Sequence, residues 1–312
     1  MREPKRILAV IDLTAASQPA AERAVAFARS IGARLELFVC DYDSQLVYNA
    51  SGEYQGLHGA RAALIDDRLR RLREIKGALA AEDLEITVDA RWDSPLADGI
   101  VRKAIESAAD IVFKDTHYHA LLKRSIFSNT DWNLIRDCPA LLWLVKPRPI
   151  AAKPRFIAAV DPLHERAKPT ELDERIIAAA KQLCYPLNGE LHVFHAFDVT
   201  PALATPMDAM AMPLPIREIT EAMRRRHTEA VHELTDAHGI ARDCVHVHEG
   251  STRERVVEIT DELRADVVVM GAVSRRGLKR LFLGNTAEAV LDKLHCDLLI
   301  VKPAGFETSV PR

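Results

Sequence analysis

The stretch Asp266-Val-Val-Val-Met-Gly271 and the residues after it, as far as Pro303, repeat an earlier part of the same chain. The earlier part begins at Asp110-Ile-Val-Phe-Lys-Asp115 and ends at Pro147, and the two align without a gap at a constant offset of 156 residues. Eleven of the 38 aligned positions are identical. This internal similarity indicates that one structural module is used twice.

A second pair of matching segments lies nearer the start of each module. Arg6-Ile-Leu-Ala-Val-Ile-Asp12 resembles Arg155-Phe-Ile-Ala-Ala-Val-Asp161, at an offset of 149 residues. The difference between the two offsets falls in the following loop and helix, where insertions are tolerated. The proline-rich stretch 147–154 is typical of a short, rather stiff linker. We therefore predict two domains, residues 1–149 and residues 150–312.

Each module alternates short apolar runs with stretches that have helical spacing. The runs predict strands near residues 7–11, 35–39, 84–88, 111–113 and 141–145, and near 156–160, 191–196, 245–248, 267–270 and 298–301. The stretches between them predict helices, among them 95–109, 129–137, 170–184, 215–238, 252–263 and 285–294. This alternation predicts an α/β fold in which each module is a five-stranded parallel sheet with helices on both faces. Ligands of such sheets bind at the carboxyl ends of the strands.

The composition narrows the class of protein. Of the 312 residues, 48% are hydrophobic and the formal net charge is −3, so the charge balance gives no reason to expect a basic surface that binds nucleic acid. It has neither the apolar run of about 18 residues that a membrane span needs nor a signal peptide. The five cysteines show no paired spacing of the kind found in disulfide frameworks or zinc sites. We expect a cytoplasmic protein.

The residues after the strand at 267–270 carry the pattern that is most informative about chemistry. Gly271 follows the strand directly, and Gly284 directly precedes the predicted helix. Asn285 and Glu288 have the spacing of a capping box, and a helix N-terminus suits a phosphate group. The loop between the two glycines also contains four basic residues that would attract a phosphate group, namely Arg275, Arg276, Lys279 and Arg280. The same residues also fit a capped helix, two turns and a solvated basic face, so both interpretations stay open.

This loop resembles that of universal stress proteins, where spaced glycines precede a hydroxyl-bearing residue. The matching residues here are Gly271, Gly277, Gly284 and Thr286. The resemblance covers nearly the whole chain, twice, and matches the tandem, UspE-type members best. It implies two domains of the universal stress protein (adenine nucleotide alpha hydrolase-like) fold. It also implies that the modules pair through Leu141–Val145 and Leu298–Val301 as an internal pseudo-dimer, which would hide two sheet edges.

The resemblance further implies which residues contact a ligand. Asp161 matches the aspartate that contacts the nucleoside, Ala196 the position against adenine, and Gly271 and Gly284 two glycines of the phosphate loop. Ser274 stands where nucleotide-binding relatives carry another glycine, and the hydroxyl-bearing residue is displaced by one position. The candidate nucleotide site, with ATP as the candidate cofactor, comprises Asp161, Ala196, Gly271, Gly277, Gly284, Asn285 and Thr286.

The first module departs further from the family pattern. The positions of Gly271, Ser274, Gly277 and Gly284 are held there by Asp115, Tyr118, Leu121 and Ser128. A carboxylate repels a phosphate, and the larger side chains fill the loop. We therefore predict that the first module does not bind a nucleotide.

The segment Thr200–Pro215 combines four prolines with Met207, Met210 and Met212. The prolines exclude a continuous helix, and methionines form adaptable apolar surfaces. Two interpretations stay open. The segment is either a loop that packs on the other module or a flexible lid over a pocket for an apolar, lipid-like ligand.

Several histidines have the alternate spacing of extended segments. Asp115-x-His117-x-His119 lacks an obvious further ligand, and His246 and His248 favour packing over metal binding. His192 and His195 should point to opposite faces of one strand. We predict no metal site.

The sequence carries none of the catalytic motifs sought: no G-x-S-x-G elbow, no G-x-x-x-x-G-K-[ST] loop and no H-E-x-x-H. We expect a non-catalytic stress-response protein that binds a small ligand or a protein partner, with nucleotide binding in its C-terminal half. The alternatives are an ATP-binding switch with weak ATPase activity, a carrier of an apolar ligand under the Met-rich segment, and a pure interaction module.

Overall fold

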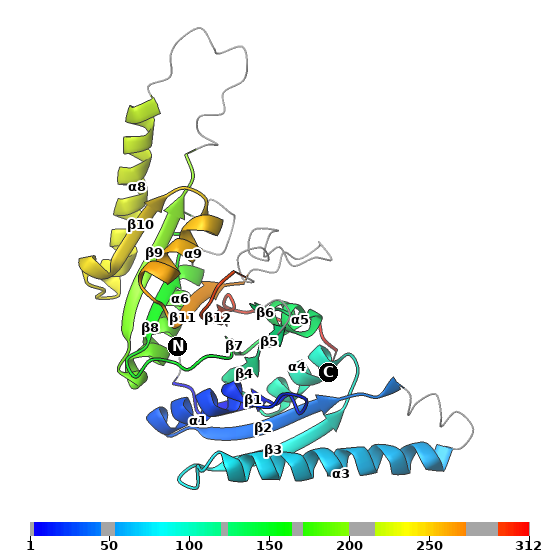
Figure 1. The fold of residues 1–312 in the computed structure, drawn as a ribbon. Helices are drawn as coiled ribbons and strands as arrows, with labels where there is room; N and C mark the ends of the chain where they lie inside the picture. Colours follow the sequence, from blue (N-terminus) through cyan, green and yellow to red (C-terminus); the bar gives the residue numbers. More distant parts are fainter. Residues whose placement is uncertain are drawn as a thin grey trace, which may run out of the picture. The chain divides into compact units, whose positions relative to one another are not determined.

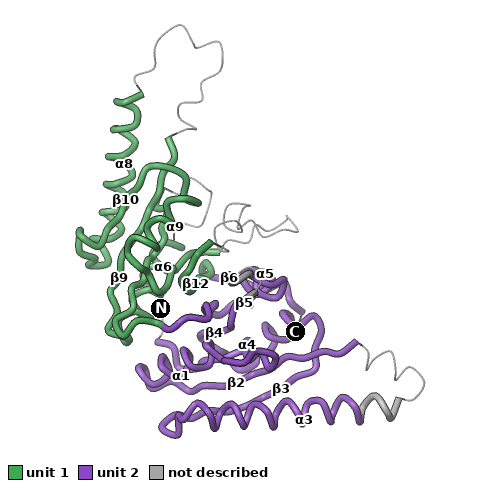
Figure 2. Tube along the Cα trace, viewed as in Figure 1, with its two compact units in different colours: residues 1, 150–304 green, residues 2–149, 305–312 purple. Residues whose placement is uncertain are grey.

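The chain forms two compact units, coloured separately in Figure 2. The computed structural model describes residues 3–44, 54–119, 124–163, 171–199, 216–272 and 293–311. The N-terminal unit contains residues 2–149 and the C-terminal unit residues 150–304. Residues 305–312 group with the N-terminal unit, whereas the sequence analysis placed them in the second domain.

The N-terminal unit is built on a parallel sheet (Figure 1). Its strand order is β3-β2-β1-β4-β7. The strands are β1 (Arg6–Val10), β2 (Arg34–Asp41), β3 (Ile86–Trp92), β4 (Ile111–Asp115) and β7 (Leu141–Val145). The helices are α1 (Pro19–Ile31), α3 (Tyr54–Ala78), α4 (Leu96–Glu106) and α5 (Asn129–Asp137).

The C-terminal unit repeats this plan with the strand order β10-β9-β8-β11-β12, again all parallel. The strands are β8 (Arg155–Ala159), β9 (Glu190–Phe197), β10 (Val245–Glu249), β11 (Val267–Gly271) and β12 (Asp297–Val301). The helices are α6 (Leu172–Cys184), α8 (Ile216–Ala237) and α9 (Thr252–Glu262), and two short 3-10 turns are η1 (Tyr185–Leu187) and η3 (Arg242–Cys244). The predicted fold, two α/β modules with five parallel strands each, is confirmed.

The central strands are buried along their length, as strands covered by helices on both faces must be. Every residue of β7 and β12 is buried. Three aromatic side chains of the N-terminal unit form a buried cluster, in which Trp143 stacks on Phe113 at 4.9 Å and Phe27 of α1 contacts both rings. Elsewhere the cores consist mainly of Ala, Leu, Ile and Val, which agrees with the low aromatic content of the chain.

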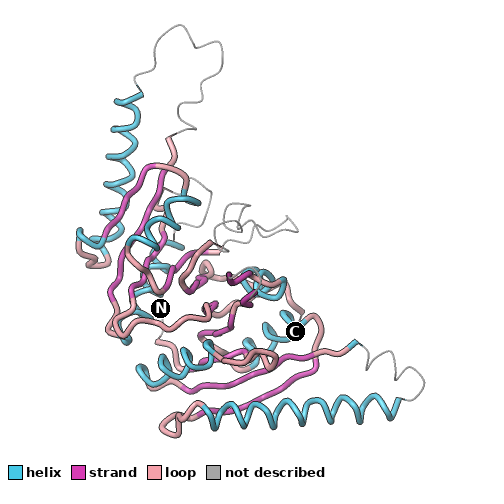
Figure 3. Tube along the Cα trace, in the orientation of Figure 1, coloured by secondary structure: helices cyan, strands magenta, loops and turns pink. Residues whose placement is uncertain are grey.

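Two local features differ from the sequence-based expectations (Figure 3). A short antiparallel ribbon, β5 (His117–His119) with β6 (Arg124–Ile126), follows β4 where no strand was predicted. Strand β3 begins at Ile86 and runs to Trp92, so it lies a few residues later than predicted.

The helix predicted at 285–294 falls almost wholly outside the described residues. In the part of the chain that the structure describes, no helix is both long and apolar enough to cross a membrane.

The aspartate that opens the repeated segment ties the amino ends of neighbouring strands together in both units. The carboxylate of Asp110 accepts the backbone N–H groups of Lys5 and Arg6 at 2.8 and 3.0 Å. Asp266 does the same for Arg155 at 2.9 Å and for Ala151 at 3.3 Å. Its identity in the two modules therefore reflects a structural role.

The last residues pack on the N-terminal unit through a few specific contacts. Ser309 donates its hydroxyl hydrogen to Asp137 at 2.7 Å, and Arg102 donates to the carbonyl of Pro311 at 3.3 Å. Between these two, Val310 is buried. Val310, Ser309 and Pro311 thus all contribute to the attachment of this segment to the N-terminal unit.

The replacement Asp266→Ala should lower the free energy of unfolding by about 2–3 kcal/mol, because two backbone N–H groups lose a charged acceptor. The measurement is urea denaturation followed by far-UV circular dichroism. Glu233→Ala, at an exposed position of α8, is the control and should change the free energy by less than about 0.5 kcal/mol. Equal effects of the two replacements would contradict the role assigned to Asp266.

Candidate functional site

The carboxyl edge of the C-terminal sheet brings three of the predicted site residues to neighbouring strands. Asp161 follows β8, Ala196 lies near the end of β9, and Gly271 ends β11. These strands are adjacent, in the order β9-β8-β11. The chain crosses from β8 to β9 on one side and reaches β11 on the other, and such a reversal of strand order opens a crevice where α/β proteins bind ligands.

The backbone around Asp161 is held from two directions. The N–H of Asp161 donates to the carboxylate of Asp173 at 2.9 Å, and Asp173, in the first turn of α6, is 1% exposed. The carbonyl of the preceding residue, Val160, accepts a hydrogen bond from the ring of His195 at 3.0 Å. The position of Asp161 is therefore set by side chains that come from a helix and from the neighbouring strand.

Gly271 has a packing role that the sequence analysis did not identify. A Cβ atom at this position would lie 2.6 Å from a side-chain carbon of Leu172 and 3.2 Å from one of Ile176. Any larger residue would therefore require the side chains of Leu172 and Ile176 to shift. The glycine lets the start of α6 approach the strand end, next to the loop that carries Asp161.

The other predicted contacts fall outside the described residues. This is so for Ser274, Gly277, Gly284, Asn285 and Thr286, and for the Met-rich positions Met207, Met210 and Met212. Their roles in nucleotide binding and in binding an apolar ligand stay predictions.

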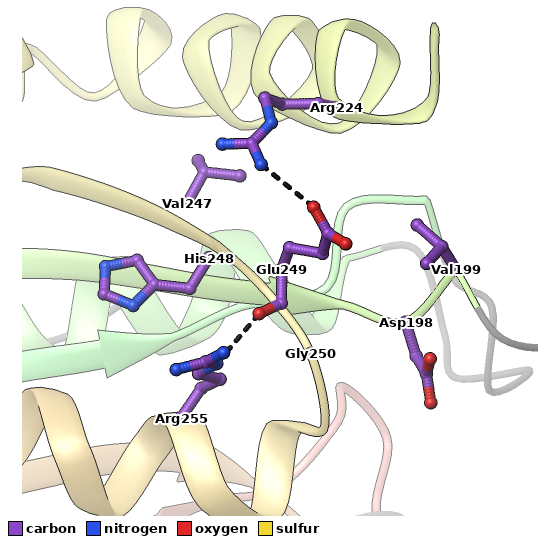
Figure 4. Close-up of a pocket in the computed structure, with 8 residues that line it drawn as sticks. All are labelled: Asp198, Val199, Arg224, Val247, His248, Glu249, Gly250 and Arg255. Carbon is purple, nitrogen blue, oxygen red and sulfur yellow. Dashed lines mark hydrogen bonds and ion pairs between the residues drawn. The ribbon is translucent and has the colours of Figure 1, made fainter. Parts of the chain in front are cut away.

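An open cleft of about 530 Å³ lies at the carboxyl ends of β9 and β10 (Figure 4). In the parallel register His248 of β10 lies beside Ala196 of β9, so this cleft adjoins the candidate nucleotide site. Its lining is mostly polar and consists of Asp198, Val199, Arg224, Val247, His248, Glu249, Gly250 and Arg255.

Two arginines from different helices hold the end of β10. Arg224 of α8 pairs with the carboxylate of Glu249 at 2.9 Å, and Arg255 of α9 donates to the carbonyl of Glu249 at 2.8 Å. Figure 4 shows the two helices on opposite sides of the strand. Gly250 has a φ of +125°, which only glycine adopts readily, and a Cβ there would lie 2.8 Å from Arg255.

Sequence reasoning missed this pair of arginines. The one signal available was Gly250 directly after an alternating strand and directly before Ser251, which caps α9. A glycine at such a junction indicates a close approach of another group to the backbone. The position of Arg224 follows from how α8 packs on the sheet, which local sequence patterns do not determine.

The corresponding edge of the N-terminal unit carries a carboxyl group of its own. Asp115 ends β4, as Gly271 ends β11, and accepts the backbone N–H of Ala20 in the first turn of α1 at 2.8 Å. Burial raises the pKa of Asp115 to about 7, although the hydrogen bond from Ala20 and the charges of Lys114 and Arg23 act in the opposite direction. The carboxyl group thus occupies the helix N-terminus at this edge.

Ser128, at the position that corresponds to Gly284, caps α5. Its side chain and that of Asp131 form a reciprocal capping box. Asp131 is fully buried and pairs with Lys114 at 2.7 Å. The predicted helix at 129–137 is present, and the side chain of Ser128 caps its N-terminus.

Two of the histidines flagged in the sequence, His192 and His195, lie on β9, and each contacts a histidine of another element. His192 contacts His246 with 3.1 Å between ring nitrogens, and burial lowers the pKa of both. His195 contacts His227 of α8, a partner that sequence reasoning did not find. His117 and His119 lie on β5, whose side chains are outside the description. Among the described residues, no group of three metal-ligating side chains converges.

Asp115→Asn tests the consequence of the raised pKa. Because Asp115 binds a proton more tightly in the folded state than in the unfolded chain, its contribution to stability is present at low pH and is lost as pH rises through about 7. The asparagine can still accept from Ala20 and carries no charge. The variant should therefore be more stable than the parent above pH 7, by on the order of 2 kcal/mol.

This difference should shrink toward zero near pH 4. Urea denaturation at several pH values measures it, and Asp66→Asn, at an exposed position of α3, serves as the control. Parallel pH curves for Asp115→Asn and the parent protein would show that Asp115 does not titrate in the expected range.

Comparison with known proteins identifies one family over both halves of the chain. A model of the universal stress protein family matches residues 3–146 and again residues 167–302. The chain is 31% identical over 310 residues to universal stress protein E of Escherichia coli strain K12, which covers 98% of this chain and 96% of that protein.

Solved structures with a similar fold cover nearly the whole chain. A putative universal stress protein from Pseudomonas aeruginosa UCBPP-PA14 has a TM-score of 0.71 and 25% identity, covering 96% of this chain and 94% of that chain. A functionally unknown protein from Pseudomonas aeruginosa PAO1 has a TM-score of 0.72 and 24% identity, covering 96% and 93%. Both modules are included in these alignments.

Proposed function

The chain belongs to the universal stress protein family, as a tandem member of the E type, and from that premise we propose that its C-terminal unit binds a nucleotide. ATP is the candidate ligand. The N-terminal unit does not bind one. The protein acts in the cytoplasmic stress response by binding, not by catalysis, and its sequence contains no G-x-S-x-G, G-x-x-x-x-G-K-[ST] or H-E-x-x-H motif.

One observation carries the proposal: Asp161, Ala196 and Gly271 meet at the carboxyl edge of adjacent strands. The family resemblance assigns these positions to the nucleoside, the base and the phosphate loop. The polar cleft beyond Ala196 extends the same edge and leaves room for a ligand. Such an arrangement supplies hydrogen-bond partners for a sugar in the carboxylate of Asp161 and the polar side chains that line the cleft.

The difference between the two units supports the restriction to the C-terminal one. At the position of Gly271, the N-terminal unit holds Asp115, whose carboxyl group already accepts the amide of Ala20. A ligand phosphate would have to displace this group and meet its charge. The pairing of the modules as a pseudo-dimer remains a prediction from the resemblance.

The matched aspartates of the two modules offer a direct test. Asp161→Ala should weaken MgATP binding about tenfold or more, because a charged hydrogen-bond acceptor for the ligand contributes about 1.5–3 kcal/mol. Asp12→Ala changes the corresponding residue of the N-terminal unit and should leave the affinity within about twofold. Isothermal titration calorimetry of the full chain measures both affinity and stoichiometry.

The expected stoichiometry is one nucleotide per chain. Two sites per chain, or a loss of affinity on Asp12→Ala equal to that on Asp161→Ala, would contradict the assignment to the C-terminal unit. An absence of binding by the parent protein would refute nucleotide binding altogether.

A further inference from the structure

Two buried histidines lie next to the backbone that carries Asp161 of the candidate nucleotide site. His195 of β9 is 2% exposed and His227 of α8 is 1% exposed. Nε2 of His195 lies 2.8 Å from Nδ1 of His227, and the two rings stack with 19° between their planes. The ring of Phe197 stacks on the ring of His227, with 4.6 Å between the two ring centroids.

The hydrogen bond to Val160 determines which nitrogen of His195 carries a proton. Nδ1 of His195 lies 3.0 Å from the carbonyl oxygen of Val160. A carbonyl oxygen only accepts, so Nδ1 must be the donor. In a neutral ring Nε2 then bears a lone pair, and the bond to His227 requires that Nδ1 of His227 donates.

Burial and the surrounding charges favour this neutral arrangement over a shared positive charge. Both rings are almost fully removed from water, which disfavours the imidazolium form. Arg224 lies one helical turn before His227 on α8, and it pairs with the carboxylate of Glu249. The hydrogen bonds therefore run in one direction, from His227 to His195 to Val160.

The end of this chain of hydrogen bonds is the peptide that precedes Asp161. The amide N–H of Asp161 in turn donates to Asp173. Both polar groups of the Val160–Asp161 peptide thus bind side chains, and the peptide plane is fixed. The position of Asp161 depends in this way on a residue of α8.

The N-terminal unit has no such arrangement. The ladder bond from Val160 to Phe194 corresponds to the bond from Ile11 to Phe38, so His195 corresponds to Val39. A valine side chain cannot donate to a carbonyl. The imidazole is therefore present only in the unit that retains the candidate nucleotide site.

We propose that His195, held in its Nδ1–H tautomer by His227, is a positioning residue for the nucleotide site, because it fixes the Val160–Asp161 peptide. This inference rests on the proposed function for its consequence in binding. The geometry itself, the tautomers and the fixed peptide, can be tested without any ligand.

The first measurement is the tautomeric state of the two rings in the parent protein at pH 7.5, from nitrogen-15 NMR of the imidazoles. Both histidines should be protonated at Nδ1 and unprotonated at Nε2. A His195 ring that carries its proton at Nε2 alone would overturn the proposal, because such a ring cannot donate to Val160.

The second measurement compares His195→Asn with His195→Leu. The asparagine amide replaces Nδ1–H as a donor, whereas leucine removes the donor. In the leucine variant the amide of Asp161 should exchange with solvent at least about tenfold faster, and MgATP should bind at least about tenfold more weakly. In the asparagine variant both values should stay within about threefold of the parent.

His192→Leu is the matched control, because His192 lies on the same strand in the other histidine pair and is also buried. It should change neither the exchange of Asp161 nor the affinity. Unchanged exchange in His195→Leu, or equal effects of His192→Leu and His195→Leu, would overturn the proposal. If the parent protein binds no MgATP, the proposed function fails, and the exchange data alone decide the positioning role.

Discussion

The two sheets depend on a carboxylate at the start of one central strand. In the C-terminal unit Asp266 donates its own N–H to Arg155, accepts the N–H of Arg155 in its side chain, and accepts the N–H of Asp297 at its carbonyl. Strands β8, β11 and β12 are therefore aligned at their amino ends. Because parallel strands rise by equal amounts per residue, alignment at one edge also brings Asp161 and Gly271 level at the other.

The predictable part of the protein is what local patterns encode. Apolar runs located the ten strands of the two sheets, and the duplication matched Asp161 to Asp12 and Gly271 to Asp115 at the carboxyl ends of equivalent strands. The partner of His195 was not predictable, because the rotation of α8 against the sheet is a tertiary property. Gly271 was interpreted as a turn residue near a ligand, while its immediate constraint is the side chain of Leu172. A single sequence does not show which residues of α6 approach the strand.

Divergence between the modules is concentrated in a few side chains on a common frame. Asp115 supplies the first unit with an internal anion where the second unit keeps a glycine. Val39 provides apolar packing where the second unit has an imidazole. In the N-terminal unit the carboxyl group of Asp115 accepts an amide of that unit itself, and Val39 lacks the donor that His195 provides. The same backbone plan therefore carries different side chains at the carboxyl edges of the two modules.

The packing of residues 305–312 on the N-terminal unit makes that unit discontinuous in sequence. A ribosome delivers residues 2–149 first, then the entire second unit, and only afterwards the segment that bears Ser309 and Val310. Domains generally fold as they emerge during synthesis, so the first unit must reach a stable fold without its final contacts. The burial of Val310 and the bond from Ser309 to Asp137 can form only after the second unit has been synthesised, so the N-terminal core is completed later than the unit that follows it in the sequence.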